Sequence, residues 1–332
     1  MRGRAVKYDV SLFRKALLQL PCIRSTRNTQ VKIARNPVKH GLMKLEGQRL
    51  VVDAIKYGAI VPELMFISEN YLHSNHYLHE TLFPILAEPN SSSGRIKVLL
   101  AAPHVLDAVS DTVSPPGIVA LAHIPQTDLG KDARVFPCAQ HTTSDSKAPL
   151  MSVVCDGISD PGNLGTLIRS AAAAQADAVY CVTPCCNPWT PKVLRAGMGA
   201  HFRISVMTGS QADVTRALSD RVHDFDAADD SGPQSRRQQH PIFVAGGSNE
   251  TCGKKMFIYN EIDWTEPFVL VLGNEAEGPK HSWEMDADDA PATRHVCIPM
   301  GNGVESLNVG VAASVILFEA HRQRRCGSGH SN

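Results

Sequence analysis

The sequence predicts an α/β protein of two domains, because short apolar segments typical of strands alternate with segments of helical periodicity. A length of 332 residues suits about two domains, and 43% apolar with 20% charged residues is ordinary for a folded chain. Residues 126–149 are polar and aperiodic, which predicts a linker. We therefore expect a first domain over 36–125, a second over 150–325 and a tail at 326–332.

Strand-like segments recur through the second domain. They are short and apolar, and helical patterns lie between several of them, which predicts a mainly parallel sheet covered by helices. The predicted strands are 152–155, 178–182, 204–207, 242–245, 268–272 and 296–298. Residues 224–241 are acidic and then rich in Gly, Pro, Gln and Arg, which favours an exposed insertion.

The first domain is expected to be a smaller α/β unit. Strands are predicted at 64–67, 96–100 and 117–121, and a loop at 87–95. One helical face is predicted from the spacing of Leu42, Leu45, Leu50, Val51, Ala54 and Ile55.

Residues 1–35 differ from the rest because they carry nine Lys and Arg residues against a single acid, Asp9. An apolar helical face is available from Leu12, Phe13, Ala16, Leu17 and Leu20. An Arg-rich, acid-poor and amphipathic leader is typical of a mitochondrial transit peptide, so we expect location in the mitochondrial matrix. The alternative is a basic arm that touches RNA.

Composition and the absence of certain motifs disfavour electrostatic nucleic-acid binders, membrane-spanning proteins, metal-binding proteins and common nucleotide-binding folds. Lys+Arg and Asp+Glu balance at 33 each, which counts against a purely electrostatic nucleic-acid binder and leaves room for recognition of RNA by shape. No segment approaches the roughly 18 apolar residues that a membrane span needs. The nine cysteines lack a metal-binding spacing, so we expect reduced thiols and no metal site. Neither a Rossmann fingerprint nor a Walker A sequence is present.

A first motif, Asp160-Pro-Gly-Asn163-Leu-Gly165-Thr-Leu-Ile-Arg169, follows a predicted strand. Asn163 is expected to cap a helix whose buried stripe contains Leu164, Leu167, Ile168 and Ala171. Arg169 then shares another face with Gly165, where a bare glycine allows close approach and a guanidinium suits a phosphate or an oxyanion. The alternative is an ordinary amphipathic helix with a solvated Arg.

A second motif is the strand 268–272 followed by a loop between Gly273 and Gly278 that carries Glu275 and Glu277. Ligands of open α/β sheets bind beyond the carboxyl ends of strands, which makes this loop a candidate site. An ordinary strand-to-helix loop with surface carboxylates is the alternative.

A third motif, residues 298–308, is a loop with Pro299 and two glycines before an apolar helix. Ser306 is expected to cap this helix, and Asn308 in its first turn is placed to bond a ligand. The buried face of the helix is expected to contain Val311, Val315 and Phe318, with Ala312 and Ile316 beside it.

Together these motifs resemble, in order and spacing, the three signatures of the SpoU/TrmH methyltransferases. The residues that carry the resemblance are Asn163-x-Gly165-x-x-x-Arg169, Leu272-Gly273-Asn274-Glu275-x-x-Gly278, and Ile298-Pro-Met300 with Ser306-Leu307-Asn308. A small departure is Asn274, which stands where many members have Ser. Segments 36–42, 45–51, 64–68 and 110–119 look like the substrate-binding domain of the rRNA members.

The resemblance implies a SPOUT α/β fold with a trefoil knot in the second domain and an L30e-like first domain. It implies a homodimer formed through the knot, binding of S-adenosylmethionine, and 2′-O-methylation of mitochondrial large-subunit rRNA at a guanosine. The residues implied to hold the cofactor are Gly273, Ile298, Met300, Leu307 and Ala245.

The resemblance also assigns the chemistry. It implies that Arg169 activates the ribose 2′-hydroxyl. Because an Arg is a poor base at neutral pH, we expect it to stabilise the developing alkoxide. We expect Glu275 to orient Arg169 or the substrate, and Ser306 and Asn308 to hold the loop and the ribose.

The RNA contacts are expected from both domains. In the second domain they are Asn163 and Arg169. In the first domain the candidates are Lys39, His40, Lys44 and Arg49, for which a solvated helix face is the alternative. Glu46 is expected to support the fold.

Three other functions remain open at this point. A tRNA 2′-O-methyltransferase on the same fold is the nearest, although such enzymes usually lack a separate α/β first domain. A catalytically inactive rRNA-binding assembly factor is the second. A dehydrogenase is disfavoured because its glycine fingerprint is missing.

Overall fold

The computed structural model describes residues 19–20, 22–58, 60–74, 96–125, 129, 150–226, 240–246, 255–275, 277–283 and 293–327. The chain divides into two compact units. The first unit comprises Met1–Pro125 with Trp189–Arg195, and the second comprises Gln126–Pro188 with Ala196–Asn332. The division between residues 125 and 126 coincides with the start of the predicted linker.

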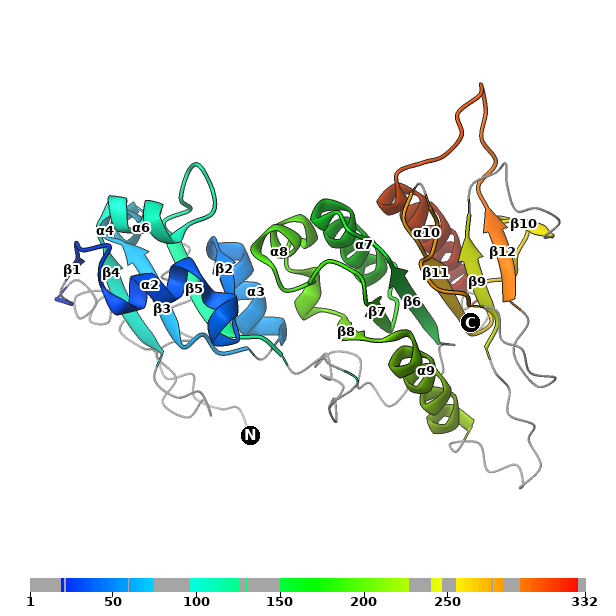
Figure 1. Cartoon of the computed structure of the whole chain (residues 1–332), viewed down its shortest axis with the longest axis horizontal. Helices are drawn as coiled ribbons and strands as arrows, with labels where there is room; N and C mark the ends of the chain where they lie inside the picture. The colour runs from blue at the N-terminus through cyan, green and yellow to red at the C-terminus, as the bar shows by residue number, and fades with distance from the viewer. Residues whose placement is uncertain are drawn as a thin grey trace. The chain divides into compact units, whose positions relative to one another are not determined.

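The first unit contains a five-stranded sheet in the order β1-β4-β3-β5-β2 (Figure 1). Its strands are β1 (Cys22–Ile23), β2 (Leu42–Glu46), β3 (Leu64–Ser68), β4 (Lys97–Ala101) and β5 (Ile118–His123). Strands β1, β4 and β3 are parallel, whereas β5 is antiparallel to both β3 and β2. The helices are α2 (Thr29–Arg35), η1 (Pro37–His40), α3 (Gln48–Gly58), α4 (Glu69–Ser74) and α6 (Pro103–Val109).

Two features of the first unit differ from the sequence prediction. Leu42 and Leu45 lie on strand β2, and the helix begins only at Gln48. Gly47 has a φ of +91°, a conformation that favours glycine and separates the two elements. The predicted boundary at residue 36 also has to move, because β1 pairs with β4 and Val31 and Ala34 of α2 are fully buried.

The second unit contains a seven-stranded sheet in the order β10-β12-β9-β11-β6-β7-β8, in which all neighbouring strands are parallel. Its strands are β6 (Met151–Asp156), β7 (Ala178–Val182), β8 (Ser205–Gly209), β9 (Ile242–Ala245), β10 (Met256–Ile258), β11 (Phe268–Leu272) and β12 (Thr293–Cys297). The predicted parallel sheet is confirmed. The predicted strands at 178–182, 242–245 and 268–272 have the observed bounds.

The helical elements that follow residue 150 are α7 (Pro161–Ala173), α8 (Pro191–Gly197), η3 (Ala200–Phe202), α9 (Gln211–Asp226) and α10 (Val309–Gly327). Helices α7 and α10 lie side by side (Figure 1). Val214 and Leu218 of α9 pack in one core cluster with Val154, Tyr180 and Met207 of the sheet. None of the described helices combines the length and apolar character of a membrane span.

The order of the strands defines where a ligand is expected. Strands β6 and β11 are neighbours, yet the chain leaves β6 toward β7 on one side and leaves β11 toward β12 on the other. Such a reversal is a topological switch point, and ligands of open α/β sheets bind at the carboxyl ends of the strands there.

Several predicted segments lie wholly or mostly outside the described residues. They are 1–18 of the leader, 87–95, most of 126–149 and 227–239 of the insertion. Helix α10 continues to Gly327, so the second domain extends past its predicted end at residue 325.

Candidate functional site

The three motifs meet in a network of side-chain hydrogen bonds at the switch point. Asn163 of α7 donates from Nδ2 to Oε1 of Glu275 over 2.7 Å. Asn308, directly before α10, donates from Nδ2 to the same Oε1 over 2.9 Å and to Oδ1 of Asn163 over 2.8 Å. One carboxylate oxygen therefore joins segments that are 112 and 33 residues apart in sequence.

The two amides of the network stand differently toward the helix caps: another residue caps α7, whereas Asn308 caps α10 with its oxygen and enters the network with its nitrogen. Asp160 caps α7 by accepting a hydrogen bond from the backbone of Asn163 over 2.8 Å. The prediction that Asn163 caps this helix is therefore wrong. The prediction that Ser306 caps α10 is wrong as well, because Oδ1 of Asn308 accepts from the backbone of Gly310 over 3.0 Å.

The position of Glu275 also suits its charge. Its Oε1 accepts a longer hydrogen bond, 3.4 Å, from the backbone of Val309, the first residue of α10. Asn163, its other partner, lies in the first turn of α7. A carboxylate is stabilised by the partial positive charge at a helix N-terminus, and Glu275 meets two of them.

The loop that carries Glu275 is shaped by two glycines. Asn274 and Gly278 exchange two backbone hydrogen bonds of 2.9 Å, and Gly278 has a φ of +71°. A Cβ placed on Gly273 would lie 2.0 Å from the Pro279 nitrogen and 2.1 Å from the Gly278 carbonyl carbon. Since both atoms belong to the backbone, no side-chain movement relieves the collision, and residue 273 has to be glycine.

A buried carboxylate fastens the continuation of this loop to β6. Asp156 has no exposed surface and accepts hydrogen bonds from the backbone and Nδ1 of His281 over 2.9 and 2.8 Å. It also accepts from Nε1 of Trp283 over 2.9 Å. These hydrogen bonds to Asp156 could not be predicted from the sequence, because neither His281 nor Trp283 belongs to a recognisable motif.

Helices α7 and α10 approach closely beside the network. The hydroxyls of Ser170 and Ser314 lie 2.7 Å apart and share a hydrogen bond. A Cβ on Gly310 would lie 3.1 Å from Thr166, so the small residue permits the close approach of the helices. The buried stripe predicted for α7 is confirmed, but Gly165 is itself buried and does not form an open surface for a ligand.

The buried face of α10 differs from the prediction. Val309, Ala313, Ile316, Leu317 and Ala320 are the buried residues. By contrast, Val311 is 47% exposed and Phe318 is 46% exposed, so these two side chains lie on the outer face. The apolar spacing of this helix fits two different faces, and only the partner helix decides which one is covered.

Arg169 and Ser306 are exposed, and their side chains make no hydrogen bond or ion pair with any residue in the described part of the chain. Glu275 bonds Asn163 and Asn308 and has no hydrogen bond to Arg169 among the described residues, so its orientation of Arg169 or of the substrate stays a prediction. Arg169 lies on α7, six residues beyond Asn163, which is just under two helical turns. Its guanidinium is accessible to a substrate.

The residues implied to hold a cofactor share the carboxyl edge of the sheet. Strand β9 pairs with β11 and β12, so Ala245 at its end is level with Leu272 and Val296. Gly273 follows β11, and Ile298 follows β12. Ala245, Ile298, Met300 and Leu307 are each half-buried, which leaves apolar surface available at this edge.

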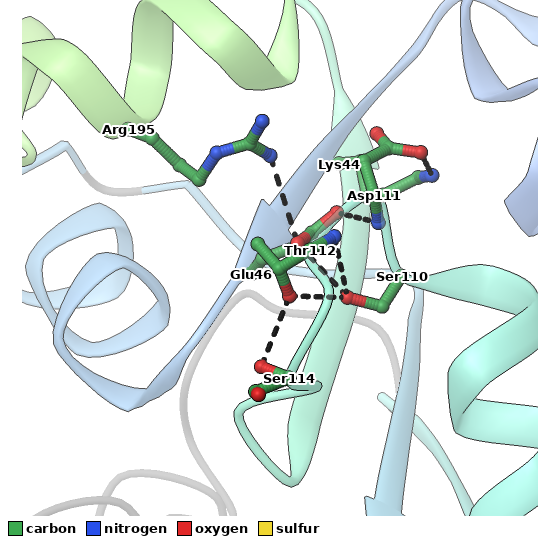
Figure 2. Close-up of polar contacts among 7 residues, drawn as sticks. All are labelled: Lys44, Glu46, Ser110, Asp111, Thr112, Ser114 and Arg195. Atoms are coloured by element: carbon green, nitrogen blue, oxygen red, sulfur yellow. Dashed lines mark hydrogen bonds and ion pairs between the residues drawn. The ribbon is translucent and has the colours of Figure 1, made fainter.

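The predicted RNA contacts of the first unit differ in their exposure to solvent. Lys44 is only 2% exposed, and its Nζ bonds Oδ1 of Asp111 over 2.9 Å (Figure 2). This burial disfavours a contact of Lys44 with RNA. Lys39 and Arg49 are exposed but flank opposite ends of β2, which are about 13 Å apart at the usual rise of a strand.

Glu46 supports the fold of the first unit, as expected. Its buried carboxylate accepts hydrogen bonds from the hydroxyl of Ser110 over 3.1 Å and from the backbone of Asp111 over 2.8 Å (Figure 2). Arg195, which belongs to the same unit, places its Nη1 3.6 Å from Glu46 Oε2 and compensates its charge.

Comparison with known proteins identifies relatives along most of the chain. Residues 150–318 match the model of the SpoU rRNA Methylase family. Human mitochondrial rRNA methyltransferase 3 is 31% identical over 86% of this chain and 69% of its own length. A 23S rRNA guanosine 2′-O-methyltransferase of Bacillus subtilis is 27% identical over 89% of this chain and 97% of its own length.

Solved structures share the fold. The SpoU methyltransferase AviRb of Streptomyces viridochromogenes superposes with a TM-score of 0.65 at 22% identity, over 90% of this chain and 99% of its own. An AdoMet-bound rRNA methyltransferase of Sinorhizobium meliloti gives a TM-score of 0.64 at 23% identity, over 92% and 98%.

Proposed function

This chain belongs to the SpoU rRNA methylase family and is an RNA methyltransferase, and we propose that it methylates a ribose 2′-oxygen of mitochondrial large-subunit rRNA. The observation that carries the proposal is the bonding of Asn163, Glu275 and Asn308 at the topological switch point. The names of the mitochondrial relatives support location in the mitochondrion, and we propose the matrix as the compartment. The bacterial relative supports a guanosine as the target.

We propose S-adenosylmethionine as the methyl donor. The half-buried apolar side chains at the ends of β9 and β12 suit the adenine ring and the aliphatic part of this molecule. Gly273 adds no side chain at the carboxyl edge of the sheet. Ala245, Gly273, Ile298, Met300 and Leu307 would hold the molecule, which supplies a methyl group already activated as a sulfonium. The insertion of β12 between β9 and β10 agrees with a knotted C-terminal segment, which we infer from the family.

The protein has to supply positioning and stabilisation of charge. The network around Glu275 fixes the Gly273 loop against the N-termini of α7 and α10 and so preorganises the cofactor edge. Arg169 is exposed on α7, the helix whose first turn joins this network, and would bind the developing alkoxide and the adjacent phosphate. An arginine guanidinium is a poor base at neutral pH, so we assign it no proton abstraction. Ser306 would contact the ribose from the loop before α10.

We also propose a homodimer through the outer face of α10. Val311 and Phe318 expose apolar surface seven residues apart on one side of this helix, with half-buried Val315 between them. A second copy of the chain is the expected partner. Val311→Glu with Phe318→Glu should convert a dimer to a monomer in sedimentation velocity, whereas a monomeric wild-type protein would contradict the proposal.

The methyl-transfer proposal is tested with the purified chain, labelled S-adenosylmethionine and a large-subunit rRNA transcript. We expect a 2′-O-methyl guanosine in the nuclease digest, and a loss of at least about 100-fold in rate for Arg169→Lys with cofactor affinity unchanged, since a point charge does not replace the guanidinium fork. A rate close to wild type would refute the role of that fork. Methylation of tRNA in place of rRNA would identify a tRNA enzyme. Absence of cofactor binding in calorimetry would identify an assembly factor.

A further inference from the structure

The segment from Cys22 to His40 carries an exposed basic surface of the folded first unit. It contains β1, α2 and η1, and its exposed cations are Arg24, Arg27, Lys32, Arg35 and Lys39. We call these residues the basic segment. Most of them fall within the predicted leader, residues 1–35, but β1 pairs in the first sheet and α2 contributes to its core.

The elements that carry these cations are anchored in the sheet and the core of the first unit. Cys22 and Ile23 pair with Leu100 and Ala101 of β4, and Val31 and Ala34 are fully buried against the domain. Removal of this segment would expose an edge of the sheet and open a core cluster. The basic segment is therefore part of the working domain.

The charge of the basic segment is not compensated locally. The sequence contains no Asp or Glu between residues 10 and 45. Within the described ranges, none of the five cationic side chains makes a hydrogen bond or ion pair. Asp107 is the acid on α6, which packs against α2, and no ion pair joins it to the basic segment. Like charges held together without acids favour a polyanionic partner.

The positions of the cations suit a continuous backbone. Thr29, Lys32 and Arg35 are the exposed positions of α2 and share one face at intervals of three residues, while Val31 and Ala34 face the core. Arg24 and Arg27 lie before the helix, and Lys39 lies after it in η1. Val38, which is half exposed beside Lys39, adds an apolar contact.

We infer that the basic segment binds the phosphate backbone of the RNA substrate, an inference that rests on the proposed function. Each phosphate contact that releases a counterion contributes about 0.7 to the slope of log K against log salt for single strands. Two lost contacts therefore reduce the slope by about 1.4, which corresponds to a loss in affinity of roughly tenfold near 0.15 M salt.

The test compares two double variants of equal charge change. Lys32→Glu with Arg35→Glu removes two cations of the basic segment. Lys56→Glu with Lys97→Glu is the matched control, because both lysines are exposed in the first unit but lie on α3 and at the start of β4. Binding of an in vitro transcript of the large-subunit rRNA is measured by fluorescence anisotropy between about 0.05 and 0.3 M salt. Unchanged thermal melting verifies folding.

We expect the Lys32/Arg35 variant to lose roughly tenfold in RNA affinity with a slope lower by about 1.4, and the control to lose less than about twofold. Equal losses in both variants would overturn the inference in favour of general electrostatics. Unchanged RNA affinity together with failure to accumulate in mitochondria would overturn it in favour of a targeting role. The proposed function fails separately, if wild-type protein binds the transcript but not S-adenosylmethionine.

Discussion

Glu275 offers the sharpest test of the site, because one of its oxygens holds three segments together. Oε1 accepts hydrogen bonds of 2.7 and 2.9 Å from Asn163 and Asn308, and one of 3.4 Å from the backbone of Val309. A hydrogen bond to a charged group contributes about 1.5–3 kcal/mol when buried. Glu275 is exposed, so water replaces part of each bond, and we expect Glu275→Ala to lower the free energy of unfolding by about 1–2 kcal/mol in total.

Glu275→Gln separates the acceptor from the charge. The amide keeps one oxygen in the same place and loses only the interaction with the N-termini of α7 and α10. That interaction is worth about 0.3–1 kcal/mol at each exposed terminus. We therefore expect Gln to destabilise less than Ala, and both variants to bind S-adenosylmethionine more weakly, because the network supports the loop that starts at Gly273.

The assay is urea denaturation followed by circular dichroism, with cofactor titration by calorimetry on the same preparations. Glu277→Ala is the matched control, since Glu277 lies in the same loop, is exposed and pairs with Lys280 alone among the described residues. Its unfolding midpoint and cofactor affinity should match the wild type. The reasoning is refuted if Glu275→Ala behaves like this control, or if Gln is as damaging as Ala in both assays.

Three further predictions concern the frame around the site. Gly273→Ala should cost about 1–3 kcal/mol or more, because its Cβ meets backbone atoms at 2.0 and 2.1 Å, whereas Gly301→Ala, with open space around it, should leave the urea midpoint unchanged. Arg324→Met should cost about 2–3 kcal/mol in thermal denaturation, since Arg324 donates to the carbonyls of Trp264, Leu150 and Glu266; a melting temperature equal to wild type would contradict this. Burial lowers the pKa of His201 from 6.5 to about 4. Between these pH values the unfolded chain therefore binds more protons than the folded chain. The free energy of unfolding should fall as the pH drops from 6.5 to 4, by up to about 3 kcal/mol. His201→Asn should flatten that pH dependence of the urea midpoint, and an unchanged slope would show that other groups cause it.

Local patterns in the sequence were enough to predict several elements of the fold. The strands 178–182, 242–245 and 268–272 were found with their observed bounds, because a strand of a parallel sheet buried on both faces is a continuous apolar run. The three motifs could also be recognised, because glycines, prolines and amides at fixed spacing are typical of tight loops and of ligand-binding sites.

Which side chains meet depends on contacts between segments that are distant in the sequence. Ser306 and Asn308 are both good capping residues, and the choice of Asn308 depends on Glu275, 33 residues earlier in the chain. Lys44 had the appearance of a surface cation, but its side chain is buried and its charge is paired with the half-exposed Asp111, 67 residues later.

The same limit explains the leader and the last helix. An Arg-rich, amphipathic leader is typical of a transit peptide, and a basic arm that touches RNA is the alternative. Pairing of β1 with β4 and the burial of Val31 and Ala34 place residues 22–35 in the first unit. Helix α10 has more apolar residues than one face can hold. It packs against α7 with Ala313 and Ile316 buried, while Val311 and Phe318 remain exposed on the outer face. A side chain is buried only where another part of the chain packs against it, and the residues of the segment alone do not specify that partner.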